Sequence, residues 1–302
     1  MGWNIGANDT ANCIGTTVGC GLISFRRAVY LVAGFAVLGA LVQGQEVMYT
    51  IGKGIVKDRL DYVAVLVAMV CAGFFVTLAT FLRVPTSTSQ AIVGGVLGIG
   101  FATNSEIDFG KFVAIADSWV ICPFLVMGLS FGLSHLLRFF LRSMVKGSLS
   151  SQNIMGWLAI ASGCYVAYSM GANNAGNAVG PIANLGIIHP TLLLIIGGIS
   201  IALGAATYGK KVADTVGKSI TPLDVPGAFV AQISSAFGMH LFSMFGIPVS
   251  TSSAIVGAIV GVGLVKGTGA VSKKTLVVIV IGWIVTPCLA ATTSYLLYKL
   301  LT

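Results

Sequence analysis

Charged side chains are scarce in this sequence. Asp, Glu, Lys and Arg together make up 9% of its 302 residues, whereas a soluble domain has about a quarter. So few charges cannot cover a water-exposed surface, and the composition excludes an ordinary soluble domain. Apolar residues make up 56% of the chain and recur in segments of roughly 20, the length that crosses a bilayer as a helix. The sequence predicts a multi-pass protein of the cell membrane, with the lipid bilayer as its surroundings.

Acidic residues are few as well, 9 against 17 Lys and Arg. In a soluble protein this excess would favour binding to nucleic acid. Here the basic residues lie between the apolar segments, which is the pattern of membrane loops. We therefore expect no nucleic-acid partner.

Residues for metal or covalent chemistry are sparse. His135 and His240 have no second ligand at metal-binding spacing, and no phosphate-binding loop, dinucleotide or Ser-His-Asp pattern occurs. The cysteines form no C-x-x-C pair and lie in or beside apolar runs, so we interpret them as small hydrophobic residues: Cys13, Cys20, Cys71, Cys122, Cys164 and Cys288. The sequence predicts no cofactor and no enzymatic activity.

An internal duplication, by contrast, is plain. The segment from Gly6 to Thr16 reads GANDTANCIGT, and the segment from Gly171 to Pro181, 165 positions later, reads GANNAGNAVGP. Three further pairs follow in the same order at offsets of 163 to 165: TIGK at Thr50 with TVGK at Thr215, PTSTSQ at Pro85 with PVSTSS at Pro248, and Trp119 and Pro123 with Trp283 and Pro287. Four correspondences in order indicate two copies of one unit.

Each copy offers five apolar segments. In the first these are the Asn-rich segment, Ala28–Met48, Tyr62–Leu82, Pro85–Ala102 and Phe112–Leu137; in the second they are Ile154–Pro181, Thr191–Thr207, Gly227–Phe245, Pro248–Val265 and Thr275–Leu297. Five crossings is an odd number, so the copies should have opposite orientations. We predict an all-α protein with a first repeat at 1–137, a cytoplasmic linker at 138–153 and a second repeat at 154–302. Whether 85–102 and 248–265 cross the membrane or re-enter stays open.

The loop charges fit this inversion. With the linker in the cytoplasm, the positive-inside tendency is followed by Arg26, Arg27, Lys266, Lys273 and Lys274. Three basic residues on the opposite side count against it, namely Lys53, Lys57 and Arg59. The first copy is also short at its start, because only five residues precede the Asn-rich motif. Half a helix cannot satisfy its backbone in lipid, so we expect Met1 to be an internal methionine of a longer protein.

The duplicated polar clusters are the candidate site. In each copy two asparagines four residues apart share one helical face, with an Asp or a third Asn beside them, and these oxygens suit a hard cation such as Na⁺. The residues are Asn8, Asp9, Asn12, Asn173, Asn174 and Asn177. The alternative is hydrogen bonding between helices.

The second constellation follows the two prolines. Hydroxyl residues after a proline open helices, and two helix N-termini facing each other would form an anion site. The residues are Ser87, Thr88, Ser89, Ser250, Thr251 and Ser252. Ordinary N-capping is the alternative. Accessory candidates are Gln90, Gln232, Lys53 and Lys218.

The duplicated GANDxAN and Pro-x-Ser-Thr elements, across essentially the whole chain, resemble the PiT family of inorganic phosphate transporters. The resemblance implies an inverted-repeat symporter, commonly a homodimer, that moves inorganic phosphate with Na⁺ or H⁺. It also implies that the Asn/Asp clusters bind the coupling cation and that the Ser/Thr turns bind phosphate. One departure is Asn174, where the family usually has Asp, and it leaves the coupling ion and its stoichiometry open.

We therefore expect a secondary transporter for inorganic phosphate. A sulfate or other oxyanion permease on the same scaffold is the nearest alternative, because it would differ only in whether a protonated oxyanion is preferred. An anion channel, in which the same helix ends line a pore, is a second. A membrane-embedded enzyme is a third, disfavoured because no pair of nucleophile and base can be recognised.

Overall fold

The computed structural model describes residues 1–82, 86–143, 149–210, 223–267 and 273–302. The described part of the first repeat forms α1 (Gly2–Gly19), α2 (Phe25–Tyr49), the π-helical turn η1 (Thr50–Gly54), α3 (Tyr62–Phe81), α4 (Thr88–Ala102) and α5 (Phe109–Ser143). The second forms α6 (Leu149–Asn184), α7 (Pro190–Thr207), α9 (Val225–Met244), α10 (Thr251–Lys266) and α11 (Lys273–Leu301). The predicted all-helical architecture is confirmed.

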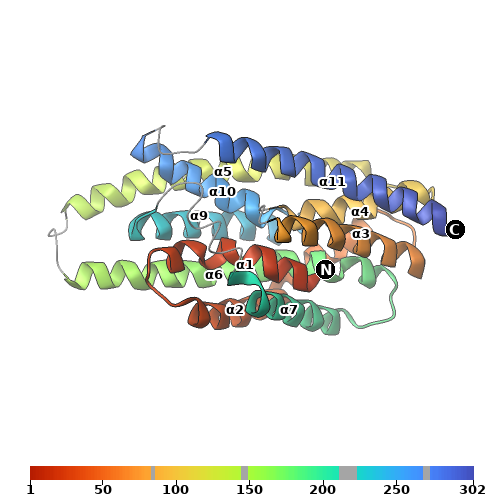
Figure 1. The fold of residues 1–302 in the computed structure, drawn as a ribbon, viewed down its shortest axis with the longest axis horizontal. Coiled ribbons are helices and arrows are strands. Elements are labelled where there is room, and N and C mark those ends of the chain that lie inside the picture. The colour runs from red at the N-terminus through yellow and green to blue at the C-terminus, as the bar shows by residue number, and fades with distance from the viewer. Residues whose placement is uncertain (83–85, 144–148, 211–222, 268–272) are drawn as a thin grey trace.

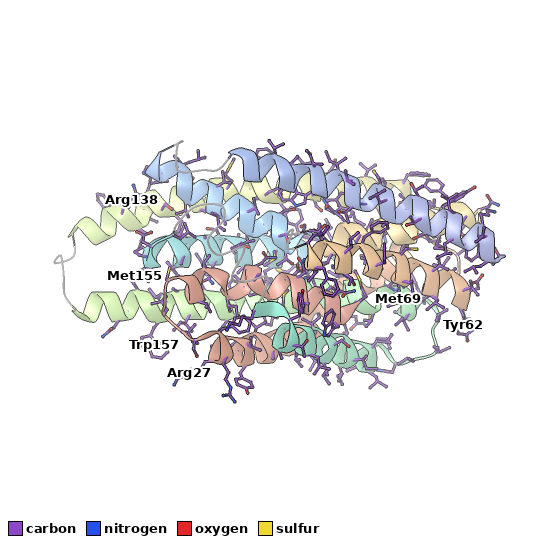
Figure 2. All side chains as sticks on the ribbon, in the orientation of Figure 1. Arg27, Tyr62, Met69, Arg138, Met155 and Trp157 are labelled. Atoms are coloured by element: carbon purple, nitrogen blue, oxygen red, sulfur yellow. The ribbon has the colours of Figure 1, made fainter. Side chains whose placement is uncertain are left out.

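The outer surface is apolar. Seven of the described helices are long and apolar enough to span a bilayer, and large side chains project outward from them (Figure 2). Phe74, Phe124 and Trp157, for example, are 60%, 64% and 72% exposed. In water such a surface would drive aggregation, whereas lipid is its natural solvent. The arrangement confirms a multi-pass membrane protein.

Two helical hairpins enter the molecule from opposite ends. The α3–α4 hairpin occupies one end and the α9–α10 hairpin the other, and their tips meet near the middle of the long axis (Figure 1). Ser89 Oγ donates to the carbonyl oxygen of Val249 at 2.6 Å, and Ser252 Oγ donates to that of Thr86 at 3.0 Å. The tips therefore interlock across the two repeats.

This geometry bears on whether the segment after each of the two prolines crosses the membrane or re-enters, which the sequence left open. We interpret the segments 86–102 and 248–265 as re-entrant, because α4 and α10 have only 15 and 16 residues and each packs along the preceding helix. A hairpin leaves by the side from which it entered, so it removes two of the five crossings expected in each copy. Three remain, which is still an odd number, and the two hairpins do point in opposite directions (Figure 1).

Each hairpin is covered by the last helix of the other repeat. Helix α5 packs along α10, and α11 packs along α4. A Cβ atom on Gly257 would lie 2.3 Å from the carbonyl oxygen of Pro123, and one on Gly94 would lie 2.4 Å from that of Pro287. Only glycine permits these contacts. Because each repeat completes the other, neither copy can form the centre alone.

The Asn-bearing helices are held equally closely. A Cβ atom on Gly171 of α6 would lie 2.0 Å from the carbonyl oxygen of Ala36 in α2, and one on Gly6 of α1 would lie 1.9 Å from that of Ile201 in α7. The glycines were expected to let the backbone bend or neighbours approach. They serve close approach, since both helices run unbroken through their Asn clusters.

Gly171→Ala is therefore expected to destabilise the protein by about 1–3 kcal/mol, the usual range for overpacking. Gly34→Ala is the matched control, because a Cβ atom there on α2 would meet nothing within 4 Å and alanine favours the helix. Thermal unfolding of the detergent-solubilised protein checks both. Equal melting temperatures for the two variants would contradict the contact.

The two ends of the molecule differ in charge. Arg27 and Arg138 lie at the end where α5 finishes and α6 begins, and Tyr62 lies at the other (Figure 2). At that opposite end Lys57 forms an ion pair with Glu106, and Arg59 donates to a backbone carbonyl. Two of the three basic residues that counted against the predicted orientation, Lys57 and Arg59, thus have local partners, one of them an acid.

Candidate functional site

The predicted polar residues converge where the hairpin tips meet α1 and α6. Each has at most 2% of its surface exposed: Asn8, Asp9, Asn12, Ser87, Thr88, Ser89, Asn173, Asn174, Asn177, Ser250, Thr251 and Ser252. Burying so many polar groups is unfavourable unless they bind one another or a ligand. The centre is therefore enclosed, and its hydrogen bonds indicate what it can hold.

Hydrogen bonds at the centre run between the repeats. Asn12 of the first donates to Ser252 Oγ of the second at 3.1 Å, and Asn177 of the second donates to Ser89 Oγ of the first at 2.8 Å. These two bonds join corresponding positions of the duplication. The two copies consequently form one site rather than two.

A carboxylate breaks this symmetry. Thr88 Oγ1 donates to Asp9 Oδ2 at 3.0 Å, whereas at the corresponding place Asn174 Nδ2 donates to Thr251 Oγ1 at 2.9 Å. The direction reverses because a carboxylate only accepts, while an amide can also donate. Asn174 Nδ2 also donates to Asp9 Oδ2 at 2.8 Å, which ties the two clusters together.

Three oxygens of the Asn/Asp clusters are buried without a donor among the described residues. They are Asn8 Oδ1, Asp9 Oδ1 and Asn177 Oδ1. Carboxylate and amide oxygens are the ligands of hard cations, and an unpaired buried acceptor is costly. These oxygens fit a small monovalent cation, which would offset the Asp9 charge.

The hairpin tips offer hydrogen-bond donors, in contrast to the acceptor oxygens of the Asn/Asp clusters. Ser87 Oγ caps α4 by accepting from the backbone N–H of Gln90 at 3.2 Å, and Ser250 Oγ caps α10 by accepting from that of Ser253 at 3.1 Å. In the part of the chain that the structure describes, neither hydroxyl donates to an acceptor. The caps that were the alternative to an anion site are therefore present, and they leave each serine an O–H to offer.

Backbone donors add to these hydroxyls. The first N–H groups of a helix have no partner within it, and the positive end of the helix dipole favours an anion there. At the tips these are the N–H groups of Thr88 and Ser89 in α4 and of Thr251 and Ser252 in α10, which follow the capping serines. The tips thus fit a tetrahedral oxyanion.

The accessory candidates lie in different places. Gln232 donates to the carbonyl of Cys13 at 2.8 Å and so joins α9 to α1. Lys53 is exposed at the end of η1, and Lys218 lies outside the described residues. Gln90 is 2% exposed and adjoins the Ser-Thr-Ser turn, with its Oε1 atom buried and unpartnered.

Two contributors to the centre are absent from the sequence-based set. Thr80 Oγ1 accepts from Asn8 Nδ2 at 3.1 Å, and the Val249 backbone exchanges two hydrogen bonds with Asn173, at 2.6 and 3.0 Å. Thr80 was detectable as a hydroxyl within an apolar segment, one turn after Thr77. Val249 contributes only its backbone, which no residue type reveals.

The other conspicuous polar residues lie away from the centre. His240 Nδ1 pairs with the Tyr165 hydroxyl at 3.0 Å, and His135 lies edge-on to Phe131 at 4.7 Å between ring centres. Both histidines thus have partners on helices rather than a metal ion. Among the described residues no three His, Cys, Asp or Glu side chains are placed to hold a metal ion.

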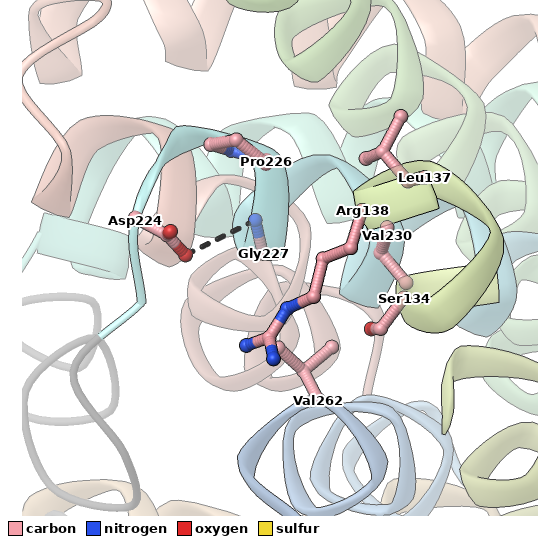
Figure 3. Close-up of a pocket in the computed structure, with 8 residues that line it drawn as sticks. All are labelled: Ser134, Leu137, Arg138, Asp224, Pro226, Gly227, Val230 and Val262. Carbon is pink, nitrogen blue, oxygen red and sulfur yellow. Dashed lines mark hydrogen bonds between the residues drawn. The ribbon is translucent and has the colours of Figure 1, made fainter. Parts of the chain in front are cut away.

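A small cavity of about 110 Å³ lies at the linker end, between α5, α9 and α10 (Figure 3). Arg138 lines it and donates to the carbonyl of Val265 at 3.1 Å, and Asp224 caps α9 by accepting from the N–H of Gly227 at 3.3 Å. None of the central residues lines this cavity, so it is separate from the site.

Two repeats of opposite orientation, with re-entrant hairpins whose helix ends meet at a buried polar centre, define the architecture of a secondary transporter. The chain belongs to the phosphate transporter family. The family model matches twice, at residues 5–151 and 142–294, once for each repeat.

Similar proteins cover nearly the whole chain. One of Thermococcus kodakarensis, named as a phosphate permease, is 31% identical over 100% of this chain and 95% of its own length. A sulfate permease of Bacillus subtilis is 32% identical over 98% of this chain and 84% of its own. The solved structure of a sodium-dependent phosphate transporter superposes with a TM-score of 0.91 at 30% identity, covering 100% of this chain and 96% of that one.

Proposed function

We propose that this protein is a symporter that carries inorganic phosphate across the cell membrane together with Na⁺. The observation that carries the proposal is the pairing of opposite chemistries in one enclosed centre. Within the described ranges, buried oxygens without donors lie on α1 and α6, and hydroxyl and N–H groups without acceptors lie at the tips of α4 and α10. Family membership and the sodium-dependent transporter of similar structure support it.

Charge compensation explains the coupling. A phosphate dianion loses its hydration in the enclosed centre, and this cost must be offset by donors and positive charge. Helix ends and hydroxyls supply the donors, and a cation at the Asp9 cluster supplies the charge. Since each ion lowers the cost of burying the other, they bind and move together. Opposed hairpins allow the centre to open to either side in turn.

Uptake of radiolabelled phosphate into proteoliposomes tests this proposal. We expect accumulation when an inward sodium gradient is imposed at equal pH, and little when only a proton gradient is imposed. Accumulation with the proton gradient alone would identify H⁺ as the coupling ion. Equilibration that needs neither sodium nor a proton gradient, with no accumulation under either gradient, would indicate an anion channel and contradict symport.

Sulfate transport is the second candidate function. It is favoured by the sulfate permease of Bacillus subtilis, which is as similar to this chain as the phosphate permease is. The donors at the helix tips would suit either anion. Radiolabelled sulfate in the same assay decides between them.

We further propose a homodimer, as the family resemblance implies, and transport without catalysis. Light scattering of the detergent-solubilised protein after size exclusion tests the dimer, with a protomer of 31.1 kDa as the reference. Recovery of unaltered phosphate from loaded vesicles tests the absence of a chemical reaction.

Asn174→Asp is expected to make transport more dependent on sodium. The new carboxylate would lie where Asn174 Nδ2 now donates to Asp9 Oδ2 at 2.8 Å, so two acidic groups would face each other. They repel unless a cation or a proton lies between them. Phosphate uptake measured against sodium concentration should therefore show a steeper dependence than in the unsubstituted protein. An unchanged curve would mean that no cation binds at this junction.

A further inference from the structure

Gln90 is the residue at the centre whose role is still unexplained. It follows the capping residue Ser87 by three positions in α4, the spacing of a capping box. In that motif the side chain reaches back to the N-terminus of its own helix. Only half of the motif is formed here, because Gln90 N donates to Ser87 Oγ while Gln90 Oε1 has no partner among the described residues.

The helix geometry tilts this side chain toward the end of α4 that carries the anion donors. Side chains in a helix tilt toward its N-terminus, and the N-terminus of α4 carries the free hydroxyl of Ser87 and the N–H groups of Thr88 and Ser89. Gln90 is 2% exposed. A buried acceptor is thus placed among donors, where an anion without hydrogen atoms would be repelled.

Hydrogenphosphate and sulfate differ in whether the anion carries a hydrogen-bond donor. Both are tetrahedral dianions of similar size, but hydrogenphosphate carries a P–O–H that must donate to an acceptor when buried, and sulfate carries none. A site with one acceptor satisfies the first and opposes the second. Sites built for a substrate hydroxyl reject analogues that lack it by far more than apolar pockets do.

The other free acceptors at the centre are assigned differently. The oxygens of Asn8, Asp9 and Asn177 belong to the clusters on α1 and α6 that fit a cation. The position that corresponds to Gln90 in the second repeat is Ser253, also buried and unpartnered. The same oxygen of its hydroxyl both donates and accepts, so a small rotation lets it serve either anion. In the Gln90 amide the acceptor and the donor are separate atoms, so the orientation of the amide decides which anion is satisfied.

We propose that Gln90 Oε1 accepts a hydrogen bond from the protonated oxygen of hydrogenphosphate and thereby selects phosphate over sulfate. The inference rests on the proposed phosphate transport and deepens it by naming a specificity-determining residue.

A neighbouring indole supplies a competing explanation. Gly94 packs on Pro287, and one turn earlier on each helix are Gln90 and Trp283. The indole N–H of Trp283 is also buried without a partner among the described residues. In that case Gln90 would accept a hydrogen bond from the Trp283 indole. Removing either partner, by Gln90→Met or by Trp283→Phe, would then have the same effect.

The test compares inhibition of radiolabelled phosphate uptake by arsenate and by sulfate. Arsenate is protonated like phosphate, so it is the matched probe. In Gln90→Met we expect the preference for phosphate over sulfate to fall about tenfold or more, the effect of one hydrogen bond to a charged group. The preference between phosphate and arsenate should not change. Gln90→Glu keeps an acceptor, so it should keep or increase the exclusion of sulfate even where uptake is slower.

Ser253→Ala and Trp283→Phe are the controls, and both should keep the sulfate preference of the unsubstituted protein. An unchanged ratio in Gln90→Met, or an equal loss in Trp283→Phe, would overturn the inference. So would parallel changes for arsenate and sulfate, since these would report a general distortion. If the unsubstituted protein takes up no phosphate, the proposed function itself fails; if it does and Gln90→Met still excludes sulfate, only the role of Gln90 fails.

Discussion

Asp9→Asn is expected to abolish most sodium-driven phosphate uptake. Asp9 is the only carboxylate among the central residues, and its Oδ2 accepts from both Thr88 and Asn174. The amide would remove the negative charge that a cation needs in this enclosed place. If the amide nitrogen took the place of Oδ2, it would face the donors of Thr88 and Asn174. If it took the place of Oδ1, it would remove the oxygen that has no donor among the described residues. The loss of one charged interaction corresponds to roughly 10- to 150-fold in cation affinity.

Asp61→Asn is the matched control for this substitution. Asp61 caps α3 at the membrane edge and accepts from the Tyr298 hydroxyl at 2.6 Å. That bond holds the pKa of Asp61 below its ordinary value of 3.8, so Asp61 stays ionised throughout a series near neutral pH. Its amide variant should keep the sodium dependence of the unsubstituted protein.

Both variants are measured first against sodium concentration at fixed pH and then against pH at fixed sodium. We expect the Asp9 variant to need far more sodium for half-maximal uptake, or to show no uptake at all. If it keeps the dependence of the unsubstituted protein on both ions, Asp9 does not bind the coupling cation and the cation site lies elsewhere.

The duplication allowed much of this architecture to be predicted. Two copies of a polar motif at constant offset, each within apolar sequence, indicate two symmetric contributions to one membrane protein. The odd number of segments then predicts their inversion. These steps use only the repeat offset and the number of apolar segments, and neither depends on how the side chains pack.

The re-entrant hairpins could not be predicted in the same way. Segments such as Pro85–Ala102 are long enough to be mistaken for crossings, and the proline at their start is compatible with a kinked span or with a turn. The choice between a kinked span and a turn is settled by the contact between the tips, where Ser89 and Ser252 donate to carbonyls of the opposite hairpin. Such contacts join residues about 160 positions apart, for which local sequence carries no signal.

Sequence equivalence predicts some partners, such as the bonds of Asn12 and Asn177 to serines of the other repeat, but not all of them. Asn8 and Asn173 occupy corresponding positions, yet Asn8 donates to Thr80 and Asn173 exchanges bonds with the Val249 backbone. The two copies therefore share the same arrangement of helices but differ in the hydrogen-bond partners of equivalent side chains. One consequence is that Asn8 Oδ1 is left free while the Asn173 oxygen is engaged, so the cation ligands need not be symmetric.

Ser87→Ala and Ser250→Ala are each expected to raise the KM for phosphate by roughly 10- to 150-fold, because each removes one donor to a charged oxygen. Both serines also cap their helices, and losing a cap costs about 0.5–2 kcal/mol of stability. Ser118→Ala is the control, since that buried serine donates only within its own helix, and its KM should not change.

A second pair of variants separates capping from binding. Glycine at an N-cap costs only a few tenths of a kcal/mol, so Ser87→Gly and Ser250→Gly keep most of the helix stability while removing the hydroxyl. If the anion accepts from these serines, the glycine and alanine variants should share the raised KM although their melting temperatures differ. A KM that follows the melting temperature would show that the serines act only as caps. The backbone N–H groups at the two tips would then be left as the donors for phosphate, and the selection of an oxyanion would depend on the helix ends rather than on side chains.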